Sequence, residues 1–547
     1  MPTLKFPLVG SYNNRSFAAV SGKDQFFKGC IITRAVNKAL NAATWYAEKR
    51  TGANALFTPD SGASAITAYY SPTTGYGYAI YVDSSGATLF RGTDNCGDVG
   101  SGSPTSPIGL ITCEIVVSGI TYVMLTYRSV SESATGWYLA SDAVSNTAYT
   151  ADGNNSTTIT DIKISGVNSV AGLYVGQKLT AASNGITGKR IVSINAGAFS
   201  AVLDGATTGG AFNDLAITKE PIAKITDAEF PSNAGETIVG GFVELDGYLN
   251  IMTQSGRVYQ SDINTPVSWG ASNYLTCSKN GGTGLGVLKY RDYVPAFTTG
   301  GFEFLYNAGN TSGSTMSSLS NSTKSSSIVP NHAMSAISAF GNVFWVGNDG
   351  NLYQLDGYSA KPISNIGNTP VSAVPALSYF VLSKQQFINI RLSSTANMWY
   401  SISGDYLVDP NLSAGAFLID GLGSAFIYLV DTGGKYYSFT TNQFQDNGSA
   451  FTMSIQIGTD MGTNKRKFVS EFRHEGDVQA SGTLSVSYSD DDGATYSTAQ
   501  TIDLTTTRQR LTGTLGSFVG KRLWKLEHSA NTPYRAERVE IDYEVAV

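Results

Sequence analysis

Charged side chains are scarce in this chain of 547 residues. Lys, Arg, Asp and Glu make up only 14% of the sequence, and the formal net charge is −6. A general nucleic-acid-binding protein carries a basic excess, so the composition argues against that class. It leaves open a surface along which DNA only passes, where attraction would be a hindrance.

Cysteine and histidine are also rare, with four and three residues. The cysteines lie far apart without a C-x-x-C pair, which indicates free thiols made in a reducing compartment: Cys30, Cys96, Cys113 and Cys277. Three histidines leave little material for histidine-based metal or nucleophile chemistry. The N-terminus shows no signal-peptide pattern, and no apolar run of about 18 residues predicts a transmembrane helix.

Glycine and tyrosine are plentiful, with 59 and 30 residues, and they recur in one pattern. An alternating apolar run, a polar turn with glycine and an aromatic-rich second run follow one another in four stretches: Tyr78–Arg91, Leu249–Ser261, Val343–Leu355 and Ile427–Phe439. This pattern is typical of β-hairpins. With the looser hairpins between them, the spacing approaches the blade length of a β-propeller, about 40–50 residues. We therefore predict an all-β fold with a propeller of six or seven blades.

The spacing fits only if a separate small domain is inserted. Asn154–Glu220 is rich in Thr, Gly and Ala, has few aromatics and predicts a small β-barrel or sandwich. From Thr463 onward the charge density rises, with 23 of the chain's 78 charged residues, which predicts a distinct C-terminal β-sheet module. The predicted divisions are an extended N-terminal arm (1–60), the first blades (61–150), the insert (151–222), the remaining blades (223–460) and the C-terminal module (461–547).

Two further segments depart from the hairpin pattern. Asn310–Ile328 is Ser-rich and aperiodic, which predicts a long mobile loop. Arg34–Arg50 is the only helix-like segment, although its spacing is ambiguous.

One short motif suggests chemistry. Ser489–Tyr496 fits the Asp-box pattern S-x-D-x-G-x-x-aromatic, which is known from sialidases and other propeller glycosidases. In that motif Ser and Asp cap a tight turn and the aromatic packs beneath it, so we interpret Asp491 and Gly493 as turn-shaping residues. The run Asp490–Asp492 lacks the first ligand of an EF-hand calcium loop. We predict no catalytic residue, no cofactor and no metal.

Other polar groups have ordinary structural explanations. Four carboxylates could serve a glycosidase, but most stand in or beside turns and nothing pairs them at the distance that hydrolysis requires: Asp246, Glu303, Asp349 and Asp356. Two basic clusters could contact a partner subunit or a phosphate backbone, and their alternative is a solvated strand face: Lys465, Arg466 and Lys467, then Lys521 and Arg522.

Several segments, in one order along the chain, together resemble the tail hub or nozzle proteins of short-tailed bacteriophages, also called packaged-DNA stabilisation proteins. The likeness lies in "KRTG", with Thr51 where proline is usual, in "EFPSNAG", in "YQSD" and in "FWVGNDGNLYQ", and it extends to the closing module with its Asp-rich turn. The residues that carry it are Lys49, Arg50, Phe230, Pro231, Tyr259, Ser261, Asp262, Trp269, Trp345, Gly350, Tyr353, Asp491 and Gly493.

The resemblance implies a structural virion protein. Such a protein forms a ring of six copies below the portal and its adaptor, extends the DNA exit channel, retains the genome and carries fibres or a needle. The implied partners are therefore the chain itself, the adaptor or portal, fibres or needle, and DNA in transit. The alternative is a glycan-binding or glycan-hydrolysing propeller at the host surface, based on the Asp box. A fibre or adhesin would show long repetitive shafts, and none is visible.

Overall fold

The protein is described from a computed structural model. It describes residues 3–7, 25–37, 42–58, 63–101, 108–128, 135–144, 147–330, 332–365, 375–393, 396–403, 406–412, 416–420, 427–431, 435–440, 442–460, 463–513 and 515–546. Within these ranges the regular secondary structure is β-strand, apart from one short 3₁₀ helix, η3 (Ala333–Ser335). The predicted all-β class is confirmed. No helix in the described part of the chain has the length and hydropathy needed to cross a bilayer.

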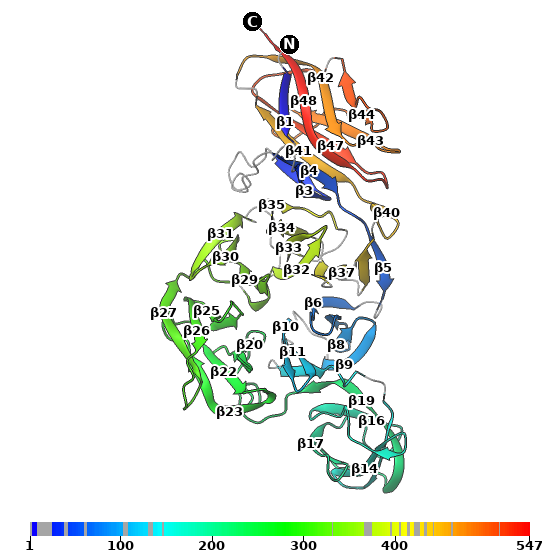
Figure 1. Cartoon of the computed structure of the whole chain (residues 1–547), viewed down its shortest axis with the longest axis vertical. Coiled ribbons are helices and arrows are strands. Elements are labelled where there is room, and N and C mark those ends of the chain that lie inside the picture. The colour runs from blue at the N-terminus through cyan, green and yellow to red at the C-terminus, as the bar shows by residue number, and fades with distance from the viewer. Residues whose placement is uncertain are drawn as a thin grey trace.

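The central part of the chain is a β-propeller, built from consecutive four-stranded antiparallel sheets (Figure 1). Five of these sheets use four strands that follow one another in sequence. They are β6 (Ser64–Tyr70), β7 (Gly77–Val82), β8 (Gly86–Arg91) and β9 (Asp94–Ser101); β20 (Val243–Leu245), β21 (Tyr248–Met252), β22 (Arg257–Asp262) and β23 (Thr265–Thr276); β24 (Gly284–Val287), β25 (Val294–Thr298), β26 (Gly301–Asn307) and β27 (Met316–Lys324); β28 (Ala336–Ala339), β29 (Asn342–Val346), β30 (Asn351–Asp356) and β31 (Ser359–Asn365); and β32 (Ala376–Leu382), β33 (Gln385–Arg391), β34 (Asn397–Ser401) and β35 (Tyr406–Val408).

A sixth sheet closes the propeller with a strand from the N-terminal region. Its strands are β36 (Ala416–Asp420), β37 (Ile427–Asp431), β38 (Tyr436–Phe439) and β5 (Ala53–Phe57). β5 pairs antiparallel with β38, with Ala53 opposite Phe439. The first and last parts of the propeller are therefore joined by backbone hydrogen bonds and leave no free sheet edge at this point.

One further four-strand run carries the insert. It consists of β10 (Ile108–Val117), β11 (Ile120–Arg128), β12 (Thr135–Ala140) and the last residues of β19 (Ala211–Lys224). The insert contains β13 (Tyr149–Asn154), β14 (Thr158–Ile164), β15 (Val167–Asn168), β16 (Gln177–Ala181), β17 (Ile191–Asn195), β18 (Ser200–Leu203) and the first part of β19. A separate apolar core fills it, which includes Tyr149, Ile159, Leu179 and Ile217. Because β19 belongs to both modules, the insert is joined to the propeller by a continuous strand as well as by linkers.

The two ends of the chain build one β-sandwich. Its first sheet contains β1 (Thr3–Pro7), β3 (Cys30–Asn37), β4 (Ala42–Lys49), β42 (Lys467–Gly476), β45 (Arg510–Thr512), β46 (Ser517–Phe518) and β48 (Arg535–Val545). Its second contains β2 (Gln25–Lys28), β41 (Met453–Asp460), β43 (Thr483–Ser489), β44 (Gln500–Asp503) and β47 (Lys521–His528). A hairpin of β39 (Gln445–Asp446) and β40 (Ser449–Ala450) precedes it. The sandwich core is continuous with Phe380, Phe387 and Trp399 of the propeller.

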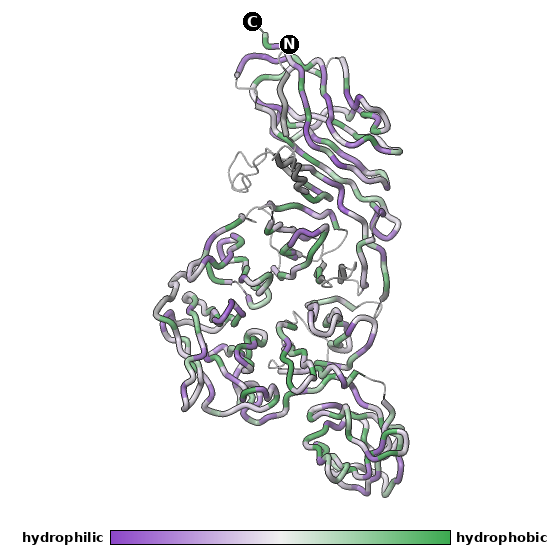
Figure 2. Tube along the Cα trace, in the orientation of Figure 1, coloured by the Kyte–Doolittle hydropathy of each residue, from purple (hydrophilic) through white to green (hydrophobic). Residues whose placement is uncertain are grey.

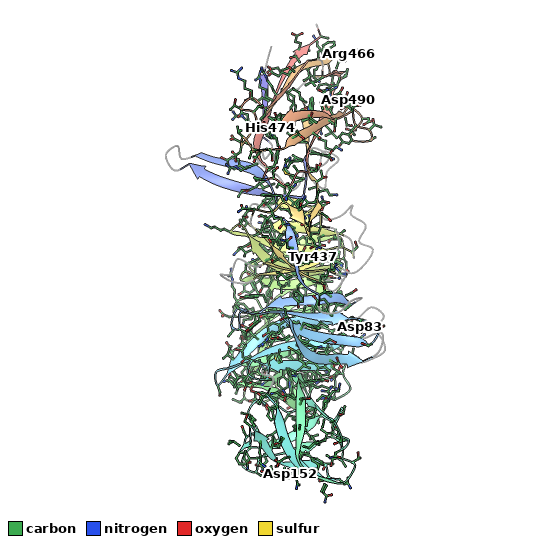
Figure 3. All side chains as sticks on the ribbon, turned by 90° about the vertical axis from the view of Figure 1, so that its right-hand side faces the viewer. Asp83, Asp152, Tyr437, Arg466, His474 and Asp490 are labelled. Atoms are coloured by element: carbon green, nitrogen blue, oxygen red, sulfur yellow. The ribbon has the colours of Figure 1, made fainter. Side chains whose placement is uncertain are left out.

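The three modules lie in a row, with the sandwich and the insert at opposite ends of the propeller (Figures 1 and 3). Both termini lie at the sandwich end (Figure 1). Hydrophilic segments are most extensive in the sandwich (Figure 2), where the sequence concentrates its charged residues.

Two segment predictions are wrong. The helix-like stretch Arg34–Arg50 contributes to the hairpin of β3 and β4, because pairing within the sandwich overrides local helix propensity. The predicted mobile loop Asn310–Ile328 contains β27, which pairs with β26 through main-chain hydrogen bonds that a Ser-rich sequence can make as well as any other.

The predicted arm 1–60 also differs from the structure. Its described residues supply β1 to β4 to the sandwich and β5 to the propeller. The sandwich then resumes at β41, from Met453, a few residues before the predicted boundary at 461. The insert begins with β13 at Tyr149 and ends within β19, close to the predicted 151–222.

Gly52 lies where the chain crosses from the sandwich strand β4 to the propeller strand β5, and a substitution there tests this crossing. A Cβ atom at this position would lie 1.9 Å from the carbonyl oxygen of Gln445, so Gly52→Ala must displace backbone. We expect a loss of about 1–3 kcal/mol in the free energy of unfolding, measured by urea titration. Gly197→Ala is the control, because its Cβ would meet nothing closer than 3.6 Å. Equal stability of the two variants would contradict the close approach.

Candidate functional site

The Asp-box residues satisfy one another within a turn after β43. Ser489 Oγ donates to Asp491 Oδ1 (2.7 Å) and accepts from the Gly493 amide (2.8 Å). Asp491 also accepts from the Thr495 amide (2.8 Å) and hydroxyl (2.5 Å), and these bonds lower the pKa of Asp491 to about 2. Gly493 adopts a φ of +87°, and the Tyr496 hydroxyl lies beside it. The Asp-box side chains therefore shape the bend.

Asp490, which the sequence analysis considered only as part of a possible calcium loop, pairs with a buried arginine. Both its carboxylate oxygens accept from Arg522, at 2.7 Å from Nε and 2.8 Å from Nη2. Arg522 also donates to the Leu515 carbonyl (2.6 Å) and lies 3.8 Å from the Tyr488 ring centroid. A bidentate pair of this kind joins the turn to β47. The alternation of charge and aromatic residues in "KRLWKL" was the available signal.

The predicted contact role does not hold for two of the five basic residues. Arg522 and Lys467 are buried, and the Lys467 ammonium donates to the Gly520 carbonyl (2.7 Å) inside the sandwich. Lys465 and Arg466 are exposed, and Lys521 is half-buried, with its pKa lowered by burial. A role in contacts with partners therefore stays a prediction for Lys465, Arg466 and Lys521.

The guanidinium of Arg50 lies at the junction of sandwich and propeller. It is fully buried and donates five hydrogen bonds: Nε to the Pro410 carbonyl, Nη1 to the Thr51 carbonyl and Asp446 Oδ1, and Nη2 to the Asn411 carbonyl and Asp446 Oδ2. All five N–H donors of the side chain are thus satisfied. The Phe451 ring centroid lies 3.9 Å from its central carbon.

Lys49, the last residue of β4, also belongs to this junction. Its ammonium donates to the Ala530 carbonyl (2.8 Å) and lies 4.6 Å from the Phe451 ring centroid. Burial, followed by the charge of Arg50, lowers the pKa of Lys49 to about 8. Asp446, the acidic partner of the junction, was missed, and the Asp-Asn-Gly turn around it was the available signal.

Phe230, Pro231 and Trp269 lie between two neighbouring propeller sheets. The Phe230 ring is fully buried, 5.1 Å from the Trp269 ring, and a side chain at Gly136 would collide with it. The Pro231 carbonyl accepts from the Glu236 amide (2.8 Å) in the turn that follows. These residues pack the sheet of β10–β12 against that of β20–β23.

The "YQSD" residues fix the hairpin connections of β21–β23. Ser261 Oγ accepts from the Leu249 amide (2.9 Å), and Asp262 accepts from the Ser268 hydroxyl (2.6 Å). The Tyr259 hydroxyl donates to Glu236 (3.4 Å), and its ring lies against Tyr274.

Trp345, Gly350 and Tyr353 form a comparable set two sheets further on. The Trp345 and Tyr353 rings stack at 5.5 Å, and Trp345 Nε1 donates to the Ile328 carbonyl. The Tyr353 hydroxyl donates to Asp349 (2.5 Å); burial, then this carboxylate, raises the pKa of Tyr353 to about 12. Gly350 adopts a φ of +76° in the turn.

The four carboxylates considered for hydrolysis take part in local bonds. Asp349 accepts from Tyr353 and Asn351, Asp246 accepts from Asn307 (3.1 Å), and Glu303 is buried and accepts from Ser318. Asp356 is exposed at the end of β30. Among the described residues, no hydrogen bond joins any two of these four.

One acidic cluster lies in the insert, where oxygens of Asp152, Asp161 and Asp214 approach within 4.8 Å of one another. The Lys163 ammonium lies 2.6 Å from Asp161 and 2.9 Å from Asp214. It supplies there the positive charge that a cation would bring, so the cluster is an ion-pair network.

The propeller encloses a cavity of about 320 Å³, here called the axial cavity. The innermost strands of the sheets line it, namely β6, β10, β20, β28, β32 and β36, together with residues at the end of β24. Its wall is mainly apolar: Leu110, Ile111, Phe242, Val287, Ile337, Leu377, Phe417 and Ile419. This volume lies at the lower end of the range for ligand pockets.

The axial cavity and a second, neighbouring cavity differ in the charges that line them. Glu114, Glu244 and Lys289 line the axial cavity. A second cavity of about 210 Å³ shares Leu110 with it and is lined by residues at or before the starts of β10, β20, β24 and β28, with Arg128 and His332 beside them. Burial and the charge of Arg128 hold the pKa of His332 below its usual value.

The four-stranded sheets themselves define the class of the central module, a β-propeller. No family model matches the chain, and no curated protein matches it. Among solved structures, the chain is similar to the Dos1 propeller (11% identity, 72% of this chain and 95% of that chain, TM-score 0.34). It is also similar to YCF48 bound to D1 peptide (9%, 71% and 96%, TM-score 0.29) and to the N-terminal domain of Nup159 (7%, 76% and 98%, TM-score 0.34). Such low identities and TM-scores carry no argument about function.

Replacing Arg50 should destabilise the junction strongly. Arg50→Ala leaves Asp446 and three backbone carbonyls without their donor, and we expect a loss of about 3–5 kcal/mol in the free energy of unfolding. Urea titration followed by tryptophan fluorescence measures it. The control is Arg535→Ala, because the Arg535 side chain is 44% exposed in its ion pair with Asp477 and such pairs contribute about 0–1 kcal/mol. Similar losses in both variants would contradict the central place of Arg50.

The Asp-rich turn gives a second test. Asp490→Ala should destabilise the sandwich by about 3 kcal/mol, because it leaves the buried Arg522 without a counter-charge.

Asp491→Ala should have a smaller effect on the stability of the sandwich. That effect should be present above the unfolded-state pKa near 3.8 and disappear as the pH falls through about 2, since the wild-type carboxyl then takes up a proton. Thermal melts from pH 7 to pH 2 measure both, and a pH-independent difference for Asp491→Ala would count against these bonds.

Proposed function

We propose that this chain is a structural subunit of a virion tail, one of six copies that form the hub or nozzle ring of a short-tailed bacteriophage. The supporting observation is where the residues of the resemblance lie. Lys49 and Arg50 are buried between sandwich and propeller, and Phe230 and Trp269 are buried between propeller sheets. Asp491 is exposed and shapes a turn of the sandwich through its hydrogen bonds. These residues hold modules, sheets and turns in fixed positions, and a rigid channel wall requires such contacts.

The arrangement of the modules suits a ring subunit. β19 runs from the insert into the propeller, and β5 follows directly on the sandwich strand β4, so the modules are connected by strands rather than by long linkers. The row of three modules offers long flanks for contacts between copies (Figure 3). A closed ring needs heterologous contacts, each above about 1,000 Å².

The DNA channel would have to lie between copies. The axial cavity of about 320 Å³ is far too small for a DNA duplex. A lumen shared by six subunits with a net charge of −6 each would let DNA slide without holding it. In this proposal the adaptor or portal, fibres or needle are the neighbouring partners, and the protein is located in the virion.

The glycan-directed alternative has less support. It rests on the Asp box, whose Ser489 and Asp491 are engaged in their own turn and whose Asp490 holds Arg522. No specific observation in the described residues adds a sugar-binding or hydrolytic arrangement to that motif.

Native mass spectrometry and negative-stain imaging of the full chain test the proposal. We expect a six-fold ring at high protein concentration or on addition of the adaptor, together with weak, salt-sensitive DNA binding. A monomer that hydrolyses a fluorogenic sialoside would overturn the proposal, and so would tight DNA binding at physiological salt.

A further inference from the structure

The axial cavity has a charge pattern that an empty structural hub does not require. Two carboxylates, Glu114 and Glu244, and one ammonium, Lys289, line a cavity whose wall is otherwise mainly apolar. Lys289 Nζ lies 3.6 Å from the Glu244 carboxylate and donates to the Glu244 carbonyl (2.8 Å). The remaining charge is that of Glu114.

Glu114 is held in place by neutral donors only. Its oxygens accept from the Ser71 and Thr73 hydroxyls and from the Thr73 amide (3.2 Å). Among the described residues it makes no ion pair. Three hydrogen bonds fix the carboxylate and leave its negative charge uncompensated, and a carboxylate has about four acceptor positions. It therefore keeps the capacity to accept one more donor.

The field of Glu114 reaches its surroundings in the cavity. Burial, and next the charge of Glu114, raises the pKa of Tyr69, and burial with Glu244 and Glu114 raises the pKa of Cys113. Both residues line the same cavity. In the second cavity, Arg128 supplies a charge of the opposite sign. A cation is thus favoured in the axial cavity and disfavoured beyond it.

We propose that the axial cavity is a binding site for a primary amine with an apolar body. The ammonium lies against Glu114, and the body lies against Leu377, Ile337 and Phe417. An ammonium brings the positive charge that the site lacks, and removing its apolar body from water contributes roughly 25 cal/mol per Å². A fatty acid of the same length would place a second negative charge beside Glu114, and a polyamine would place charges against the apolar wall. The inference rests on the cavity alone and is independent of the ring.

Isothermal titration calorimetry of the full chain with n-octylammonium, n-octanoate and n-octanol tests this site. We expect octylammonium to bind at least tenfold more tightly than octanoate or octanol. Glu114→Gln should weaken the binding of octylammonium at least tenfold and leave the affinity for octanol unchanged. Lys289→Gln should increase the affinity for octylammonium, because it removes the one Lys or Arg that lines the axial cavity.

Arg128→Gln is the matched control, because Arg128 lines the second cavity and not the axial cavity. This change should leave the affinity for octylammonium unchanged. Circular dichroism and thermal melts confirm that each variant is folded. The proposal is overturned if octylammonium does not bind, if octanoate binds equally well, or if folded Glu114→Gln binds octylammonium like the wild type. Reduced affinity in Arg128→Gln equal to that in Glu114→Gln would also overturn it, since the effect would then not be local.

Discussion

The connection between sandwich and propeller depends on the five hydrogen bonds that the Arg50 guanidinium donates. The chain builds sandwich strands, crosses to the propeller beside Arg50, runs around the propeller and returns through the hairpin that contains Asp446. The guanidinium thus contacts the outgoing segment at Thr51, the end of β35 at Pro410 and Asn411, and the returning hairpin. A lysine could not make this set, because its donors radiate from one nitrogen. One buried side chain therefore fixes three backbone segments, and its own segment is 360 and 396 residues away in sequence from Pro410 and Asp446.

Closure of the propeller follows from the same crossing. β5 can pair with β38 only if the chain leaves the sandwich at the right place and angle, and Gly52 permits the close approach to Gln445 there. At the other end of the molecule, β19 plays the corresponding part by belonging to the insert and to the propeller at once. Both terminal modules are thus joined to the propeller by hydrogen-bonded backbone, which stiffens the row of modules more than side-chain contacts alone would.

Local pattern was enough to predict some elements and not others. The hairpins and the insert were predictable, because turn glycines and alternation act over a few residues. The placement of the N-terminal strands was not, since β1, β2, β4 and β5 each pair with a strand about 380 to 540 residues away in sequence, and no local signal specifies such a partner. The same limit applies to the site residues. Asp491 and Gly493 could be read as turn residues from their own motif, whereas the role of Asp490 depends on Arg522 and that of Asp446 on Arg50. The sequence predicted Lys467 and Arg522 as surface cations. The alternation of charged and apolar residues along a strand does not show which of its two faces is buried by the rest of the sandwich.

The buried cations also change the electrostatic argument about a DNA channel. In the described residues, the buried Lys, Arg, Asp and Glu side chains are four cations, Lys49, Arg50, Lys467 and Arg522, and two carboxylates, Glu303 and Glu540. These four cations are therefore not available to contact a phosphate backbone. Two of them are paired with carboxylates, Arg50 with Asp446 and Arg522 with Asp490. Each buried cation lies against an aromatic ring and makes hydrogen bonds to carbonyls, so it stabilises the interior. In the proposed ring, cations buried in this way could not hold the phosphate backbone, which suits a channel along which DNA slides.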